Sequence, residues 1–90
     1  MTKEEALEYL ADGHNIWSVP TARDICEALG VKWDGTSLVQ PWGHEGTLGV
    51  ESLVLSRYVA EKLGVADQAA RLLGRGLQAR EYARLIAGRV

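Results

Sequence analysis

The chain has 90 residues, of which 47% are hydrophobic, and it carries a net charge of −2 at pH 7. This length and composition predict one globular domain, residues 1–90, and exclude a disordered chain. Cys26 is the only cysteine, which excludes an internal disulfide, and no apolar run approaches the roughly 18 residues that would span a bilayer.

The sequence favours a cytoplasmic protein that does not enter membranes. The opening residues Met1–Glu5 are acidic, whereas a secretory signal begins basic and continues apolar. A lone cysteine is also typical of a reducing compartment.

Two helices are predicted in the first third of the chain. Thr2 and Glu5 have the spacing of a capping box, which predicts a helix from about Lys3 to Asp12. Apolar residues at helical spacing predict a second helix that begins near Pro20 and ends before Gly30.

Residues 32–50 break the helical period and are predicted to form an irregular segment, a hairpin, or both. If a hairpin forms, we expect Thr36–Val39 to pair with Thr47–Val50. Trp33 and Trp42 are expected to hold this segment on the core. The residues that interrupt the helical period are Gly35, Pro41, Gly43, Gly46 and Gly49.

The helical pattern returns at Glu51 and continues to the end of the chain. Leu55, Val59 and Leu63 are four residues apart and precede Gly64, a typical helix stop. Two further helices are expected over 66–74 and 78–87. The predicted fold class is therefore mainly α, a small helical domain of about five helices.

Residues 56–75 fit the positional requirements of a helix-turn-helix. Such a unit needs a small residue where the helices cross, a turn that tolerates positive φ, and apolar residues facing inward on the second helix. Ala60 meets the first requirement, Leu63-Gly64-Val65 the second, and Ala70 with Leu73 the third. The stretch Val59–Ala70 resembles the helix-turn-helix of bacterial and phage regulators and excisionases. The resemblance covers about twenty of the 90 residues and implies DNA binding.

A weaker copy of this pattern lies 34 residues upstream, where Leu29-Gly30-Val31 aligns with Leu63-Gly64-Val65. Over 21–42 the sequence leaves two interpretations open. One is a second unit that resembles a helix-turn-helix, and the other is a helix stop that two unrelated segments share.

Charge is distributed unevenly along the chain. Residues 1–51 hold three basic and nine acidic residues, a net −6, whereas residues 52–90 hold seven basic and three acidic residues, a net +4. The basic half predicts a surface for a polyanion or an acidic partner, or two halves that attract each other.

The leading functional hypothesis is a small DNA-binding regulatory protein whose 66–74 helix enters the major groove. Asp67, Gln68 and Arg71 are expected near bases. The alternative is a non-enzymatic helical module that binds a partner protein through the last helix or the tryptophan segment. A homodimer fits the DNA-binding hypothesis, because small regulators often read two half-sites. The arginines expected at phosphates are Arg57, Arg75, Arg80 and Arg84.

Residue types and spacings give no sign of a catalytic or metal site. His14, His44, Glu45 and Cys26 do not stand at a recognised ligand spacing. Gly74-Arg75-Gly76 lacks the ending of a phosphate-binding loop. The sequence therefore predicts no enzyme, no metal and no cofactor.

Overall fold

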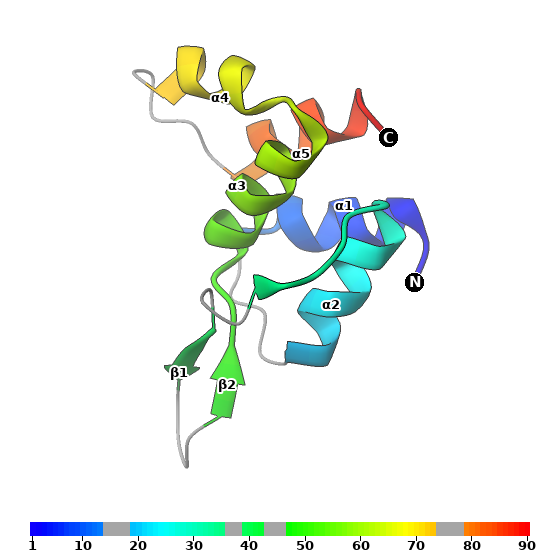
Figure 1. Ribbon diagram of the computed structural model, residues 1–90, viewed down its shortest axis with the longest axis vertical. Helices are drawn as coiled ribbons and strands as arrows, with labels where there is room; N and C mark the ends of the chain where they lie inside the picture. Colours follow the sequence, from blue (N-terminus) through cyan, green and yellow to red (C-terminus); the bar gives the residue numbers. More distant parts are fainter. Residues whose placement is uncertain (14–18, 36–38, 43–46, 74–78) are drawn as a thin grey trace.

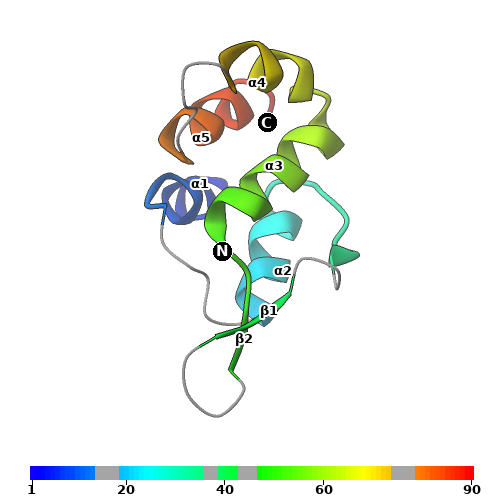
Figure 2. The same ribbon diagram turned by 90° about the vertical axis from the view of Figure 1, so that its left-hand side faces the viewer.

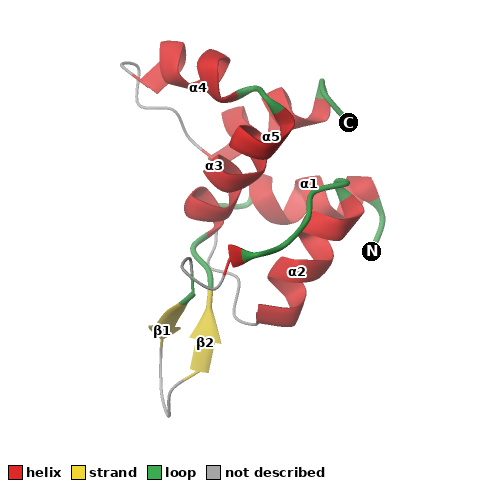
Figure 3. Cartoon of the chain, in the orientation of Figure 1, coloured by secondary structure: helices red, strands yellow, loops and turns green. Residues whose placement is uncertain are grey.

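The computed structural model describes residues 1–13, 19–35, 39–42, 47–73 and 79–90, and these form a mainly helical fold, as predicted. Figures 1 and 3 show the arrangement of five described helices and one hairpin. The longest described helix has 12 residues, and none of them has the length and apolar character needed to cross a membrane. In chain order the elements are α1 (Lys3–Ala11), α2 (Val19–Ala28), β1 (Gln40–Trp42), β2 (Thr47–Gly49), α3 (Ser52–Leu63), α4 (Ala66–Leu73) and α5 (Ala79–Ala87).

The first helix begins with the predicted capping box. The Thr2 hydroxyl accepts a hydrogen bond from the Glu5 backbone N–H at 3.1 Å, and the Glu5 carboxylate accepts one from the Thr2 N–H at 3.3 Å. These two bonds satisfy N–H groups that have no acceptor inside the helix. The helix ends at Ala11, one residue earlier than predicted.

The hairpin confirms one predicted strand and corrects the other. β2 lies where it was expected, but its partner is Gln40–Trp42 rather than Thr36–Val39. Gln40 pairs with Gly49 and Trp42 with Thr47, so Pro41 lies within the first strand. Proline removes a donor and is accepted in a strand that has a pairing neighbour on one side only, which a two-stranded hairpin provides.

Both Leu-Gly-Val segments end a helix with the same hydrogen bonds. Gly30 has φ +75° and Gly64 has φ +78°, a left-handed conformation that favours glycine. The N–H of Val31 donates to the carbonyl of Cys26 at 2.8 Å, and that of Val65 donates to Ala60 at 2.9 Å. This six-to-one bond is the mark of a Schellman motif.

The two segments lead into different structures. After Gly64 a new helix starts at Ala66, whereas residues 31–34 are not helical and the chain then leads to β1. The two segments therefore share a helix stop, but no helix follows Gly30 directly as α4 follows Gly64.

The segment after α2 is held on α3 by contacts around Tyr58. The rings of Trp33 and Tyr58 meet edge to face with centroids 6.1 Å apart. The Tyr58 hydroxyl donates to the carbonyl of Lys32 at 2.9 Å and also lies against the Asp34 carboxylate. Lys62 lies 5.5 Å from the centre of the Tyr58 ring. The prediction that Trp33 packs inward is confirmed, while the side chain of Trp42 lies outside the described residues.

Helix α5 connects the two parts of the core. Its Ala83 and Ile86 pack in the main core, which includes Leu10 of α1 and Leu55 of α3. Its Tyr82 packs in a smaller cluster at the end of α3. Figure 2 shows α5 between α1 and α4, so the acidic first helix and the basic last helix lie against each other.

The hairpin and α4 occupy opposite ends of the molecule. Both views place the hairpin at one end of the longest dimension, 38 Å, and α4 at the other. The hairpin therefore does not flank α4, and a surface built around α4 is made by α3, α4 and α5.

Candidate nucleic-acid interface

The turn between α3 and α4 is built by Gly64 and stabilised by a small apolar cluster. Gly64 donates its N–H to the carbonyls of Ala60 and Glu61, and its left-handed conformation redirects the chain into α4. Ala60 is 1% exposed and packs with Val65 and Tyr82. Because Ala60 has only a methyl group, Val65 and the Tyr82 ring approach α3 closely. The predicted position of Gly64 between two packed helices is confirmed.

The inward face of α4 is only partly described. The sequence predicted that Ala60 contacts Ala70 and that Leu73 faces inward. The side chains of Ala70 and Leu73 lie outside the described residues, so these two expectations stay predictions.

The outward face of α4 carries the three side chains that were predicted to approach bases. Asp67, Gln68 and Arg71 are all exposed. Asp67 and Arg71 are four residues apart and therefore lie on the same side of the helix. Figures 1 and 2 show α4 at one end of the molecule, and of the three side chains Gln68 also borders a hollow beside the end of α5.

The arginines predicted to meet phosphates fall into separate groups. Arg80 and Arg84 are exposed on α5 and lie one helical turn apart. Arg84 lines one hollow together with Gln68, which brings α5 and α4 together on one surface. Arg57 is exposed on α3 but lines a different hollow, beside Tyr58 and Glu61. Arg75 lies outside the described residues.

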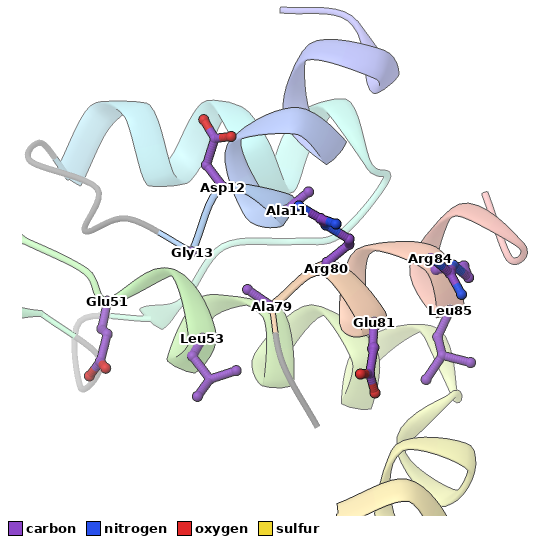
Figure 4. A pocket seen from close by; sticks show the side chains of 10 residues that line it. All are labelled: Ala11, Asp12, Gly13, Glu51, Leu53, Ala79, Arg80, Glu81, Arg84 and Leu85. Atoms are coloured by element: carbon purple, nitrogen blue, oxygen red, sulfur yellow. The ribbon is translucent and has the colours of Figure 1, made fainter. Parts of the chain in front are cut away.

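A third and larger hollow, of about 900 Å³, mixes basic and acidic side chains where α1, α3 and α5 meet (Figure 4). Arg80 and Arg84 line it together with Asp12, Glu51 and Glu81. Within the described part of the chain, however, no arginine forms an ion pair with a carboxylate. The carboxylates lower the positive potential around both arginines in this hollow, but Arg84 also lines the smaller hollow beside Gln68.

Arg89 is a candidate site residue that sequence reasoning missed. It is exposed, and its Nε donates a hydrogen bond to the carbonyl of Leu63 at 3.0 Å. This bond satisfies a carbonyl at the end of α3, where a positive charge is favourable. No local signal identifies the contact, because the partners are 26 residues apart in the chain.

Cys26 does not have the surroundings of a nucleophile. Its thiol is buried in the core, and burial, with a smaller contribution from the charge of Glu27, raises the pKa of Cys26 to about 12. A reactive cysteine has a lowered pKa and some exposure. Among the described residues no three His, Cys, Asp or Glu side chains lie together as a metal site, and His14 and His44 lie outside them.

No family model, curated protein or solved structure matches this chain.

Proposed function

We propose that this protein is a small helix-turn-helix DNA-binding regulator in which α4 enters the major groove. The observation that supports this function best is the unit of α3, the Gly64 turn and α4, with Asp67, Gln68 and Arg71 exposed on α4. An α-helix fits the major groove, and residues near its start reach base edges. Both Asp67 and Gln68 lie in the first turn of α4.

Each exposed side chain of α4 has a chemical partner among the bases. The Arg71 guanidinium can donate two hydrogen bonds to a guanine edge, and the Asp67 carboxylate can accept one from a cytosine amine. The Gln68 amide matches adenine. Phosphate contacts fall to the arginines on α3 and α5, which position the protein without reading sequence.

The size of α4 favours a protein that binds as a homodimer. Eight residues span about 12 Å, which covers only a few base pairs in one groove. Two copies related by a twofold axis would place two such helices in successive grooves, as two half-sites require. A cytoplasmic location suits this function and the buried Cys26 thiol.

Selection of bound sequences from a random duplex library, followed by fluorescence anisotropy on the selected duplex, tests the proposal. Arg71→Ala is expected to weaken specific binding by about 1 to 3 kcal/mol and to relax preference at one base pair. Because Arg71 is exposed, the free energy of unfolding should change by no more than about 0.5 kcal/mol.

Arg23→Ala is the matched control, since Arg23 is an exposed arginine on α2, outside the proposed interface. It removes the same charge and is expected to leave base preference unchanged. If the wild-type protein fails to bind pooled genomic DNA fragments even at low salt, the DNA-binding proposal is overturned.

The alternative is a protein-binding module, and one observation favours a particular face for it. Tyr9 is 47% exposed on α1 and lies in a hollow with Glu5, Glu8 and Asp12. An exposed tyrosine among carboxylates suits a basic partner. In the tryptophan segment Trp33 is half-buried against Tyr58 and offers a partner less surface, while the arginine-bearing last helix, α5, stays the other candidate face.

A further inference from the structure

The hollow between the α3–α4 turn and the end of α5 is positively charged. Its volume is about 360 Å³, and Gln68, Arg84 and Arg89 supply its polar side chains. No acidic residue lines it, in contrast to the larger hollow that Arg84 also borders. Val65 and Leu85 line it as well and supply apolar surface.

Arg89 already contacts the α3–α4 turn in the absence of a ligand. Its Nε is bonded to the Leu63 carbonyl, and its Nη2 lies 3.8 Å from the position that a side-chain carbon on Gly64 would take. The guanidinium therefore lies against the turn. An arginine that is already fixed loses less conformational freedom on binding, which favours affinity.

The two arginines approach the hollow from different directions. Arg84 extends from α5, which crosses the molecule, while Arg89 lies beyond the last turn of that helix and reaches the end of α3. With one NH group of Arg89 bonded to Leu63, its remaining NH groups are available to a second acceptor. A tetrahedral anion offers oxygens in several directions and can accept hydrogen bonds from more than one of the side chains that line the hollow.

We infer that this hollow binds a phosphate group, held by Arg84, Arg89 and the Gln68 amide. The inference rests on the proposed function and extends it, because the phosphate is one of the DNA backbone. It reassigns Gln68 from base reading to backbone contact and adds Arg89 to the interface. Binding a backbone phosphate here fixes α4 in the groove from its first turn, while Asp67 and Arg71 remain for the bases.

The salt dependence of DNA binding tests this site. Log affinity falls linearly with log salt concentration, and each phosphate contact makes this slope steeper by about 0.9. Arg84→Gln is expected to reduce that slope by about 0.9, because Arg84 makes no hydrogen bond within the described part of the chain that its loss would break. Arg23→Gln, which removes the same charge on α2, is expected to leave the slope unchanged.

Arg89→Gln serves as the second variant, with a check on folding. It should lower the slope as Arg84→Gln does, and circular dichroism should show that α3 and α5 persist. Suppose that the wild-type protein binds DNA and that Arg84→Gln and Arg89→Gln are both folded. If their salt slopes then equal that of Arg23→Gln, the phosphate site is overturned and the proposed function stands.

A titration with inorganic phosphate separates the two proposals if the wild-type protein does not bind DNA. Amide and guanidinium resonances of Gln68, Arg84 and Arg89 should then shift in nuclear magnetic resonance spectra, and Arg84→Gln should abolish the shifts. That result would support the phosphate site and overturn the DNA-binding function. Shifts that are absent, or that are the same in Arg84→Gln, overturn the site.

Discussion

At the scale of single residues, two buried groups in the core make stability sensitive to small chemical changes. Cys26 is fully buried and is surrounded by apolar side chains. Ser52, at the start of α3, is also fully buried, and its hydroxyl has no hydrogen-bond partner among the described residues. Neither group belongs to the candidate interface, so both report on the fold alone.

Cys26 is expected to make the protein less stable at high pH. Its pKa is raised from 9.0 to about 12 in the folded protein, so between these values the unfolded chain loses the proton while the folded chain keeps it. The free energy of unfolding therefore falls as pH rises above 9, by about 1 kcal/mol at pH 10. Urea unfolding at several pH values measures this slope.

Tyr58 requires a control in that experiment, because its pKa is also raised, chiefly by its hydrogen bond to Asp34. Its effect on stability has the same sign. The measurement should therefore compare Tyr58→Phe with Tyr58→Phe/Cys26→Ala. A pH slope that is equal in the two proteins would show that Cys26 is not its source.

Ser52→Ala is expected to give a more stable protein than Ser56→Ala, by about 1 kcal/mol. The Ser56 hydroxyl donates to the Ser52 carbonyl at 2.8 Å, whereas the Ser52 hydroxyl is buried without a partner among the described residues. Burying an unpaired hydroxyl costs free energy, and removing it recovers that cost. Both side chains are fully buried in α3, so chemical denaturation of the two variants compares an unpaired with a paired hydroxyl at matched burial. Equal stability would mean that the Ser52 hydroxyl finds a partner in solution.

At the scale of elements, the two Leu-Gly-Val stops have equal geometry but different consequences. Gly30 leads from α2 into a non-helical segment, and Gly64 leads from α3 directly into α4. The backbone at each glycine is left-handed, and a side-chain carbon would meet no atom closer than 3.8 Å at either. The effect of alanine at these positions therefore comes from backbone strain.

Gly30→Ala and Gly64→Ala are each expected to lower the free energy of unfolding by about 1 to 2 kcal/mol, because alanine is disfavoured at positive φ. Thermal unfolding measures both. Only Gly64→Ala should also weaken DNA binding beyond what its stability loss explains, since the direction of α4 depends on this turn. Equal binding by the two folded variants would contradict a role for the Gly64 turn in presenting α4.

At the scale of the whole molecule, α5 makes the interface dependent on the first half of the chain. Helix α5 packs on both α1 and α3, and Ala83 and Ile86 belong to the same core as Ala6 and Leu10. The unit of α3, the Gly64 turn and α4, together with α5, therefore shares its core with the first half of the chain.

A fragment of residues 51–90 is expected to lose most of its helical structure. It would expose the side of α5 that α1 covers, and short helices without tertiary contacts are marginal in water. Circular dichroism and urea unfolding compare the fragment with the full chain. A cooperative transition in the fragment would show that the second half folds on its own.

Local sequence pattern predicted the helices, their ends to within about one residue, and the exposed side chains of α4. The Thr2–Glu5 capping box and the stops at Gly30 and Gly64 depend on bonds that reach no more than five residues along the chain, so local pattern is enough to find them. Helical spacing likewise placed Arg71 outward.

Contacts between residues that lie far apart in the sequence could be identified only from the tertiary structure. The first strand is Gln40–Trp42 and not the predicted Thr36–Val39, because the partner of β2 is set by pairing across the hairpin and not by the residues of either strand alone. The Tyr58 contacts join positions 24 to 26 residues apart, and the Arg89 bond to Leu63 also spans 26 residues. Packing of α5 against α3 and α4 brings Gln68, Arg84 and Arg89 to one hollow. The spacing of residues within one helix does not predict this contact between helices.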